Sequence, residues 1–205
     1  MIFEKWDLRL DLHKLQEHLK QNVLDKEISR QSDAFGGWSV LSGSGDYKDG
    51  WQQGHLLLKP NVSDEVKNKV RNQMKKNFSE YTIETEICTG YLLEVINFIR
   101  DKNLNPYRAR IICLSARSFS SWHTDSPPGM YAVRLHIPII TNEHCFFETR
   151  DEREHAPADG SAYFVYVNRE HRVVNNGDMN RYHLVMDVCD RNYVSNYHRF
   201  QDFKG

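Results

Sequence analysis

The chain has 205 residues, of which 40% are hydrophobic and 27% are charged. This length suits one domain, and this balance of residues can bury a core, so general disorder is excluded. The formal net charge is −1, without the basic excess that binding to nucleic-acid phosphates requires. We therefore expect a single domain over residues 1–205 that has no nucleic-acid partner.

No apolar run approaches the roughly 20 residues that span a bilayer, and the first residues carry charges where a secretory signal is apolar. The four cysteines lie far apart and form no C-x-x-C pair, which is typical of reduced thiols. These features predict a cytoplasmic protein without a membrane partner. They indicate no oligomeric state.

Residues 1–105 are expected to be mostly helical. Apolar residues at helical spacing predict a helix over 8–24, and a second apolar stripe predicts one over 89–102. A Lys-rich helix with an N-cap serine is expected over 63–78, and its basic face is interpreted as solvated. A short strand is expected at 37–41, before a loop rich in Gly and Ser.

Residues 106–190 have the composition of short strands, rich in β-branched and aromatic residues and separated by turn-forming segments. Such spacing favours a β-sandwich or barrel over a parallel βαβ sheet, and no Gly-rich phosphate-binding motif is present. Residues 191–205 are expected to form a tail. The expected strands are 108–116, 131–140, 144–149, 162–167, 172–174 and 181–188.

The H-x-D triplet at His123 and Asp125, with His171 further along the chain, is a candidate metal site. Two imidazoles and one carboxylate can occupy one face of an octahedral Fe(II) and leave the opposite face open. Alternate residues of an extended segment project to the same side, which suits this spacing. One such triplet also arises by chance, so an ordinary loop histidine is an equal alternative for His123 alone.

Arg134 and Arg181 interrupt runs that otherwise have the composition of buried strands. A buried guanidinium needs a carboxylate, either from a structural acid such as Asp187 or Glu148 or from a ligand. Arginine binds a carboxylate with two parallel hydrogen bonds. The placement of each arginine after a candidate metal ligand favours the ligand for Arg181, whereas for Arg134 the two interpretations are equal.

Several other side chains are weaker candidates. His136 alternates with apolar neighbours and is a candidate contact to the metal ligands or to a co-substrate, whereas His183 is interpreted as structural. Aromatic side chains beside strands are usually core, and the Gly/Ser-rich loop forms either a lid or a packed surface loop. The candidate substrate-pocket residues are Trp38, Trp51, Trp122 and Tyr131.

An ordered series of motifs covers about 80 residues. Its members are RARIICL, the HTD triplet, RLHIPIITN, DGSAYFV, EHRVVNNG and RYHLVMD, from residue 108 to residue 187. This series resembles the aspartyl/asparaginyl β-hydroxylase-like family of Fe(II)/2-oxoglutarate dioxygenases, which includes cis-proline hydroxylases. Animal aspartyl β-hydroxylases of the group lack the carboxylate ligand, so the chain is more similar to the bacterial-type members.

The resemblance implies an α+β fold, a double-stranded β-helix (jelly-roll, cupin-like) with N-terminal helices packed outside. It implies that His123, Asp125 and His171 bind Fe(II). It also implies that Arg181 holds the distal carboxylate of 2-oxoglutarate, with Arg134 and His136 near this co-substrate. Together with O2, these groups would hydroxylate a free amino acid or a residue of a peptide, of Asp, Asn or Pro type.

Two other classes of function stay open. One is a cupin-like metalloenzyme, such as an isomerase, that does not use 2-oxoglutarate. The other is a non-catalytic jelly-roll that binds a small carboxylate. Arg181 separates the first of these from a dioxygenase, because an enzyme that needs only the metal has no use for a dicarboxylate clamp.

Overall fold

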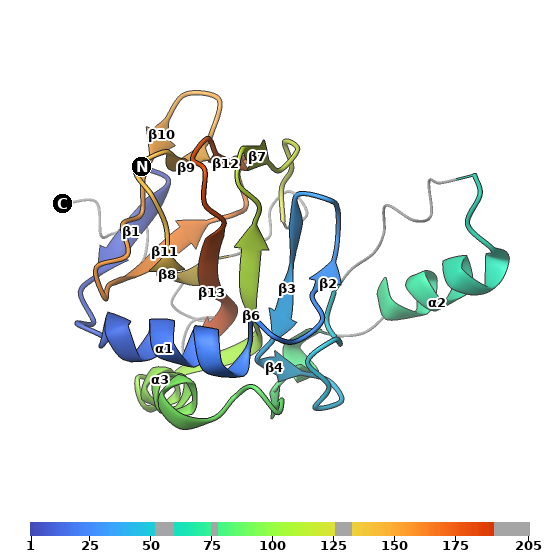
Figure 1. Cartoon of the computed structure of the whole chain (residues 1–205), viewed down its shortest axis with the longest axis horizontal. Helices are drawn as coiled ribbons and strands as arrows, with labels where there is room; N and C mark the ends of the chain where they lie inside the picture. The colour runs from blue at the N-terminus through green and yellow to red at the C-terminus, as the bar shows by residue number, and fades with distance from the viewer. Residues whose placement is uncertain (52–59, 75–77, 126–132, 191–205) are drawn as a thin grey trace.

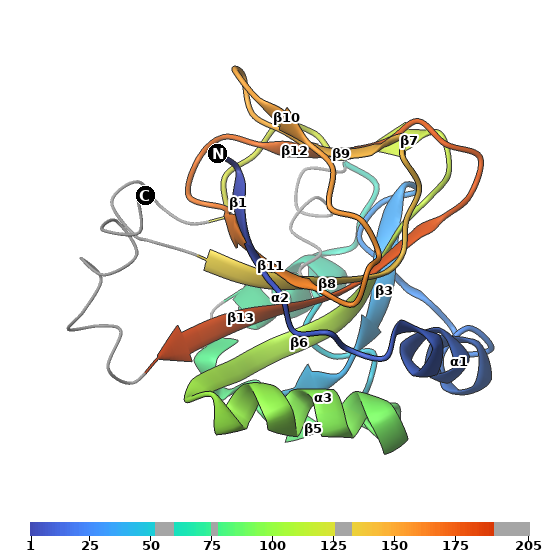
Figure 2. The same ribbon diagram turned by 90° about the vertical axis from the view of Figure 1, so that its left-hand side faces the viewer.

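The computed structural model describes residues 1–51, 60–74, 78–125 and 133–190, so the expected tail and Tyr131 lie outside the described residues. Two antiparallel sheets face one another, and helices α1 and α3 lie outside the larger sheet (Figures 1 and 2). This arrangement confirms the predicted α+β jelly-roll with helices packed outside. Within the described part of the chain, no helix has the length and apolar character to cross a membrane.

The large sheet has seven strands in the order β1-β11-β8-β13-β6-β3-β2, all paired antiparallel. Its strands are β1 (Phe3–Trp6), β2 (Ser29–Arg30), β3 (Phe35–Ser39), β6 (Leu104–Leu114), β8 (Val133–Ile140), β11 (Ala162–Tyr166) and β13 (Arg181–Asp190). The small sheet has the order β10-β9-β12-β7. Its strands are β7 (Ser118–Phe119), β9 (Cys145–Glu148), β10 (Arg153–Glu154) and β12 (Arg172–Asn175).

The remaining elements lie around these two sheets. They are α1 (Leu12–Asn22), the pair β4 (Leu41–Ser42) and β5 (Ile83–Glu84), α2 (Asp64–Met74), the 3₁₀ helix η2 (Phe78–Glu80) and α3 (Gly90–Asp101). All three predicted helices are present, and α1 and α3 are shorter than predicted at both ends. The predicted helix over 8–24 begins only at Leu12, because the side chain of Asp11 caps it by accepting from the backbone N–H of Lys14.

The first 105 residues contain more strand than we expected. β1, β2 and β3 belong to the large sheet, and β1 pairs with β11 from the second half of the chain. Because β1 has four residues and β2 only two, neither carries a period-2 pattern long enough to detect. The expectation of a mostly helical first part is therefore wrong in these segments.

Both faces of the central strands are buried. Leu135, Ile137 and Leu184 belong to the apolar cluster that also contains the buried residues of α1 and α3. Their sequence neighbours, such as Val185, point to the opposite face, toward the small sheet. Arg134 and His136 interrupt this second face of β8, so the sheet presents polar side chains to its interior.

Candidate metal centre

His123 and Asp125 lie in the segment that follows β7, and His171 directly precedes β12. His123 and His171 form a two-residue antiparallel bridge, in which each backbone N–H donates to the other residue's carbonyl, over 3.0 and 2.9 Å. The backbone N–H of Asp125 donates to the carbonyl of Val167 over 3.0 Å. Main-chain hydrogen bonds thus hold the three residues beside one another.

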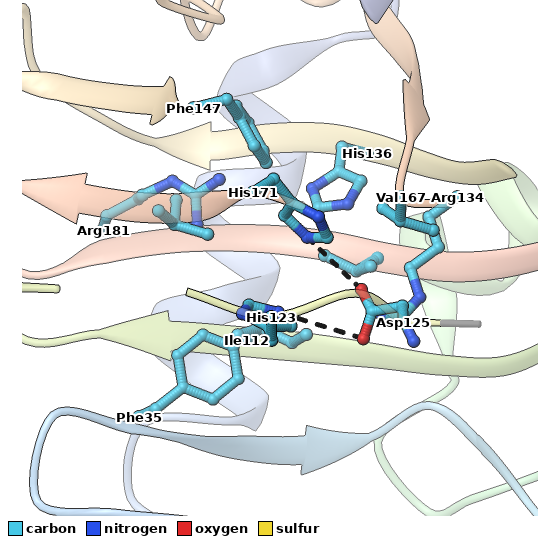
Figure 3. Close-up of a pocket in the computed structure, with 12 residues that line it drawn as sticks. Phe35, Ile112, His123, Asp125, Arg134, His136, Phe147, Val167, His171 and Arg181 are labelled. Atoms are coloured by element: carbon cyan, nitrogen blue, oxygen red, sulfur yellow. Dashed lines mark hydrogen bonds and ion pairs between the residues drawn. The ribbon is translucent and has the colours of Figure 1, made fainter. Parts of the chain in front are cut away.

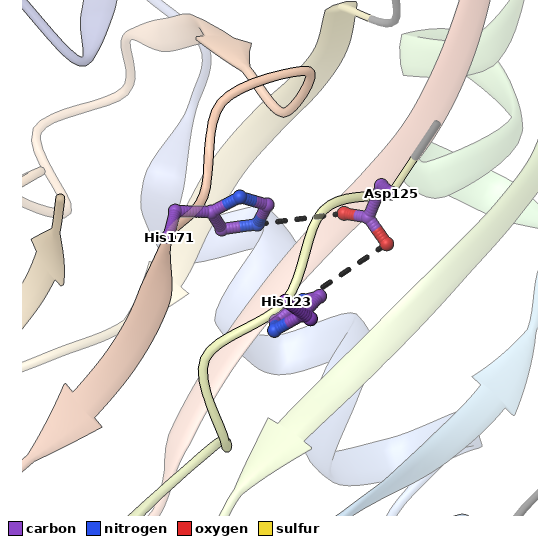
Figure 4. A group of neighbouring side chains, drawn as sticks. All are labelled: His123, Asp125 and His171. Atoms are coloured by element: carbon purple, nitrogen blue, oxygen red, sulfur yellow. Dashed lines mark ion pairs between the residues drawn. The ribbon is translucent and has the colours of Figure 1, made fainter. Parts of the chain in front are cut away.

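The three side chains converge on one point, as Figure 4 shows. One ligand atom from each of His123, Asp125 and His171 lies within 4.8 Å of the others. The Nε2 atom of His123 is 3.9 Å from Oδ1 of Asp125, and that of His171 is 3.5 Å from Oδ2. This group of two imidazoles and one carboxylate matches the donor set of non-haem Fe(II) oxygenases.

Hydrogen bonds at the far side of each ring select the atom that faces a metal. Nδ1 of His123 lies 2.7 Å from the carbonyl of Ser121, and Nδ1 of His171 lies 2.8 Å from the carbonyl of Arg169. Because a carbonyl only accepts, each Nδ1 carries a hydrogen, and Nε2 is the ring atom left for a metal. Both rings turn this Nε2 atom toward Asp125.

Asp125 is ionised and forms an ion pair with a buried arginine. Nη1 of Arg134 lies 2.5 Å from Oδ2 of Asp125, and Nε of the same arginine lies 3.0 Å from Oδ1 of Asp187. Burial by itself raises the pKa of Asp125, but Arg134 and the two histidines lower it well below its ordinary value. Of the two structural acids considered from the sequence, Asp187 is therefore the one that pairs with Arg134.

Arg181 has no such partner. It is 2% exposed and lies over the ring of Phe147, with its guanidinium carbon 5.0 Å from the ring centroid. Its Nη2 lies 2.8 Å from Nδ1 of His183, and no carboxylate of the described residues lies within ion-pair distance. The other acid that we weighed, Glu148, pairs with Arg172. Burial lowers the pKa of Arg181 to about 10, so it remains charged at neutral pH.

His136 lies beside His171 in the same cavity, on the side of that ring away from Arg181 (Figure 3). It is 7% exposed, and neither of its ring nitrogens has a hydrogen-bond partner among the described residues. Burial lowers its pKa well below the ordinary value, and the charges of Arg181 and Arg134 lower it further. A neutral imidazole with two unused hydrogen-bonding atoms is a binding group that a ligand can complete.

One cavity contains all six polar residues. Figure 3 shows Arg181 at one end, Arg134 and Asp125 at the other, and both candidate histidine ligands between them. Sequence reasoning did not select the apolar residues of the wall, although their alternation on the strands is a signal that could have found them. The apolar lining consists of Phe35, Ile112, Phe147, Val167, Val173 and Val185.

A sequence model of the family described as aspartyl/asparaginyl beta-hydroxylase matches residues 7–191. The chain belongs to this family. Membership makes the protein a hydroxylase, and thus an oxidoreductase, as the series of motifs had indicated. The match extends well beyond the 80 residues of the recognised series and includes most of the first half of the chain.

Comparison with solved structures identifies similar jelly-roll enzymes at low sequence identity. The viral collagen prolyl hydroxylase of Paramecium bursaria Chlorella virus-1, solved with 2OG, has 9% identity and a TM-score of 0.50, over 92% of this chain and 96% of that one. A prolyl-4-hydroxylase of Pseudomonas putida has 10% identity and a TM-score of 0.49, over 93% of each chain. The viral enzyme supports the fold. A search of curated proteins finds no match.

The candidate substrate residues of this hydroxylase lie in different places. Trp38 packs on the ring of Tyr182 within the cluster beneath the helices, and its Nε1 donates to the carbonyl of Lys26 over 3.1 Å, so it does not line the cavity. Trp51 is buried against Ile112 and Val185, which do line it.

Trp122 lies beside the metal donors in the sequence but contacts two arginines. The guanidinium carbons of Arg150 and Arg172 lie 4.1 and 4.8 Å from its ring centroid. This stacking is a cation–π arrangement. Trp122 therefore packs on arginine side chains, of which Arg172 belongs to the small sheet. It is absent from the cavity lining that the described residues form.

Proposed function

We propose that this hydroxylase is an Fe(II)- and 2-oxoglutarate-dependent dioxygenase. Its substrate would be a free amino acid or an amino-acid residue of a peptide, of Asp, Asn or Pro type. It would hydroxylate an unactivated C–H bond and form succinate and CO2. The observation that carries the proposal is the pairing of a metal donor set with a buried, carboxylate-free Arg181 in one cavity.

His123, Asp125 and His171 would hold the iron. The donor set fits Fe(II), because both Nε2 atoms are free to coordinate and Asp125 is ionised. Arg134 positions the Asp125 carboxylate through a short ion pair, and the main-chain bridge orients the two rings. Three protein ligands on an octahedral ion leave positions for other ligands.

Arg181 and His136 would bind the co-substrate. A planar guanidinium forms two parallel hydrogen bonds with one carboxylate, and this fits the distal end of a dicarboxylic acid. Such a ligand offsets the burial cost of the unpaired Arg181 charge. His136 lines the same cavity beside His171 with both ring nitrogens unpartnered among the described residues, so it is available to contact the same molecule.

The remaining wall of the cavity is apolar. Bound Fe(II) and 2-oxoglutarate would together activate O2, of which one oxygen atom would enter succinate as CO2 is lost and the other would enter the substrate. The chain's own part is to orient these ligands and to exclude water from them. Phe147, Val173 and Val185 contribute to that exclusion, because they line the cavity without offering a hydrogen bond.

Succinate release tests the proposal without knowledge of the substrate. Purified protein is incubated with Fe(II), ascorbate and 2-oxoglutarate, and slow succinate formation is expected even without substrate. A screen of amino acids and peptides then measures a +16 mass product together with faster succinate release. If no candidate raises succinate above background, and 2-oxoglutarate does not bind, the metalloenzyme without a co-substrate replaces this function.

A further inference from the structure

Arg110 is another buried arginine, and the metal site described above does not use it. It lies on β6 and is 3% exposed. Its cross-strand neighbour on β13 is Val185, and Ile112 follows it on the same face of β6. Both of these neighbours line the cavity. Arg110 therefore points to the interior of the barrel, one strand step beyond the cavity wall.

Two hydrogen-bond donors at this place lack an acceptor. The guanidinium carbon of Arg110 lies 5.2 Å from the ring centroid of Trp51, which is itself 3% exposed. Among the described residues, neither Nε of Arg110 nor Nε1 of Trp51 has a hydrogen-bond partner. Both groups can only donate, so the missing partner is an acceptor. Such unpaired buried groups are rare in proteins and call for an explanation.

The charges around Arg110 also favour an anion. Burial and the like charges of Arg108 and Arg134 lower the pKa of Arg110 well below its ordinary value, whereas Asp187 and Asp125 oppose this shift. Both carboxylates pair with Arg134, over 3.0 and 2.5 Å, and Asp125 also belongs to the candidate metal donor set. Neither is within ion-pair distance of Arg110, so a ligand carboxylate would fill a place that these two acids leave open.

We propose that Arg110 and Trp51 form a binding site for a carboxylate of the substrate. Arg110 is paired with Val185, two residues before the partner of Arg134 on β13, whereas Arg181 is paired with Leu114 further along β6. Figure 3 shows Arg134 and Arg181 at opposite ends of the cavity. The inference rests on the proposed function, because it assumes that Arg181 holds the co-substrate. The substrate is then an anionic amino acid or peptide that enters with its carboxylate away from Arg181 and its reacting C–H near the metal.

The first experiment measures binding in a complex that cannot turn over. Mn(II) replaces Fe(II), O2 is excluded, and 2-oxoglutarate saturates the protein. Free L-amino acids and their α-carboxamides are then titrated by calorimetry, with L-aspartate, L-asparagine and L-aspartic acid α-amide included to separate the α-carboxylate from a side-chain carboxylate. We expect the acid that binds to do so at least about tenfold more tightly than its amide, because the amide loses a charge-assisted hydrogen bond.

Variants locate this preference. Arg110→Met should remove it, Trp51→Phe should weaken acid binding several-fold while keeping the ring, and Arg117→Gln is the control because Arg117 is exposed and paired with Asp178. Equal binding of acids and amides by the unmodified protein overturns the proposal. The proposal is also overturned if no free acid binds saturably, or if Arg110→Met still binds acids more tightly than their amides.

Two further measurements separate the possible failures. Arg110→Met should raise the melting temperature of the ligand-free protein, because it removes an unpaired buried charge, whereas a fall indicates a structural role and overturns the proposal. The Kd of 2-oxoglutarate should stay within about twofold of the unmodified value. A large increase in this Kd would mean that Arg110 binds 2-oxoglutarate, and this result also overturns the proposal. If the unmodified protein binds no 2-oxoglutarate, the proposed function fails, while the acid-to-amide comparison without it still tests Arg110.

Discussion

At the scale of single residues, the feature that best suits the site to a metal is the hydrogen bond that Nδ1 of each candidate histidine ligand donates. The carbonyls of Ser121 and Arg169 hold the hydrogen of each imidazole on Nδ1. The Nε2 atoms therefore face Asp125 and are the ring atoms available to a metal. This arrangement suits His123 and His171 to coordination.

We predict that His171→Ala abolishes tight metal binding. The change removes one of three protein donors and leaves only His123 and Asp125. Calorimetric titration with Mn(II) measures the loss. His144→Ala is the matched control, because His144 is exposed and far from the donor set. Retained metal affinity in the His171 variant would remove this residue from the site.

We predict that Arg181→Gln raises the Kd of 2-oxoglutarate by roughly 10- to 100-fold, the value of a hydrogen bond to a charged group. The Kd of Mn(II) should not change, because Arg181 lies at the far end of the cavity from Asp125. Arg117→Gln, at an exposed ion pair, should change neither constant. An unchanged affinity for 2-oxoglutarate in the Arg181 variant would contradict the assigned role.

At the scale of elements, β13 contributes to two different environments through alternate residues. Leu184 and Met186 pack in the cluster beneath the helices, whereas Arg181 and Val185 line the cavity. The period of two that defines a strand therefore separates stability from binding on the same element. Substitutions at neighbouring positions should have different consequences.

We predict that Leu184→Ala lowers the free energy of unfolding by about 2–5 kcal/mol, because it leaves a void in the core. The affinity for Mn(II) should remain, since the side chain faces away from the metal donors. Urea unfolding measures the change. Leu24→Ala, at a more exposed leucine, should cost far less. A loss of Mn(II) affinity in Leu184→Ala would mean that the two faces of β13 are not separated as described.

Helix α1 carries a buried histidine that gives a pH dependence. Nε2 of His18 lies 2.9 Å from the carbonyl of Ile87, and burial lowers the pKa of His18 below 6.5 even though this hydrogen bond opposes the shift. The unfolded chain therefore binds this proton more readily. Above pH 6.5, His18 therefore does not reduce the free energy of unfolding. Below that value, this free energy decreases as the pH falls toward the pKa of His18 in the folded protein.

We predict that His18→Gln reduces the loss of stability between pH 7.5 and pH 5.5. The measurement compares urea midpoints at the two pH values in both proteins. His13→Gln on the same helix is the control, because the side chain of His13 is largely exposed. The buried His136 and His183 also have lowered pKa values, so part of the dependence should persist. An identical dependence in the His18 variant would contradict the assignment.

The same elements explain what could be predicted from the sequence. The candidate metal donors were predicted from the H-x-D triplet together with the ordered series of motifs, and the structure brings them together. The helices were predicted because their apolar stripes are long. The contacts of Arg134 with Asp187, and of Arg110 with Trp51, depend on the register of strands distant in sequence. The spacing of apolar residues in the sequence does not encode that register. Only the folded structure therefore shows which arginines pair with a carboxylate and which do not.

At the scale of the whole molecule, the cavity couples ligand binding to stability. The donors come from the segment after β7 and from the residue before β12, while Arg181 and His136 belong to the large sheet. A metal and a co-substrate that bridge these places bind only the folded protein. Their binding free energy therefore adds to the free energy of unfolding.

We predict that Mn(II) and 2-oxoglutarate together raise the melting temperature, and that a chelator reverses the effect. At 100 times its Kd, one ligand adds about 2.7 kcal/mol to the free energy of unfolding. Differential scanning fluorimetry measures the shift. The increase should be absent in His171→Ala. A full shift in that variant would show that the ligands bind elsewhere.

The interior face of β13 also sets a length. Arg181, His183, Val185 and Asp187 follow one another at two-residue steps, and a strand rises about 3.3 Å per residue, so the first and last lie about 20 Å apart along it. A five-carbon dicarboxylate anchored at Arg181 extends over only part of that distance. The remaining length of β13 leads to Asp187, which pairs with Arg134 at the end of the cavity where Asp125 lies, so the strand itself spaces the anchor of such a ligand from that far end.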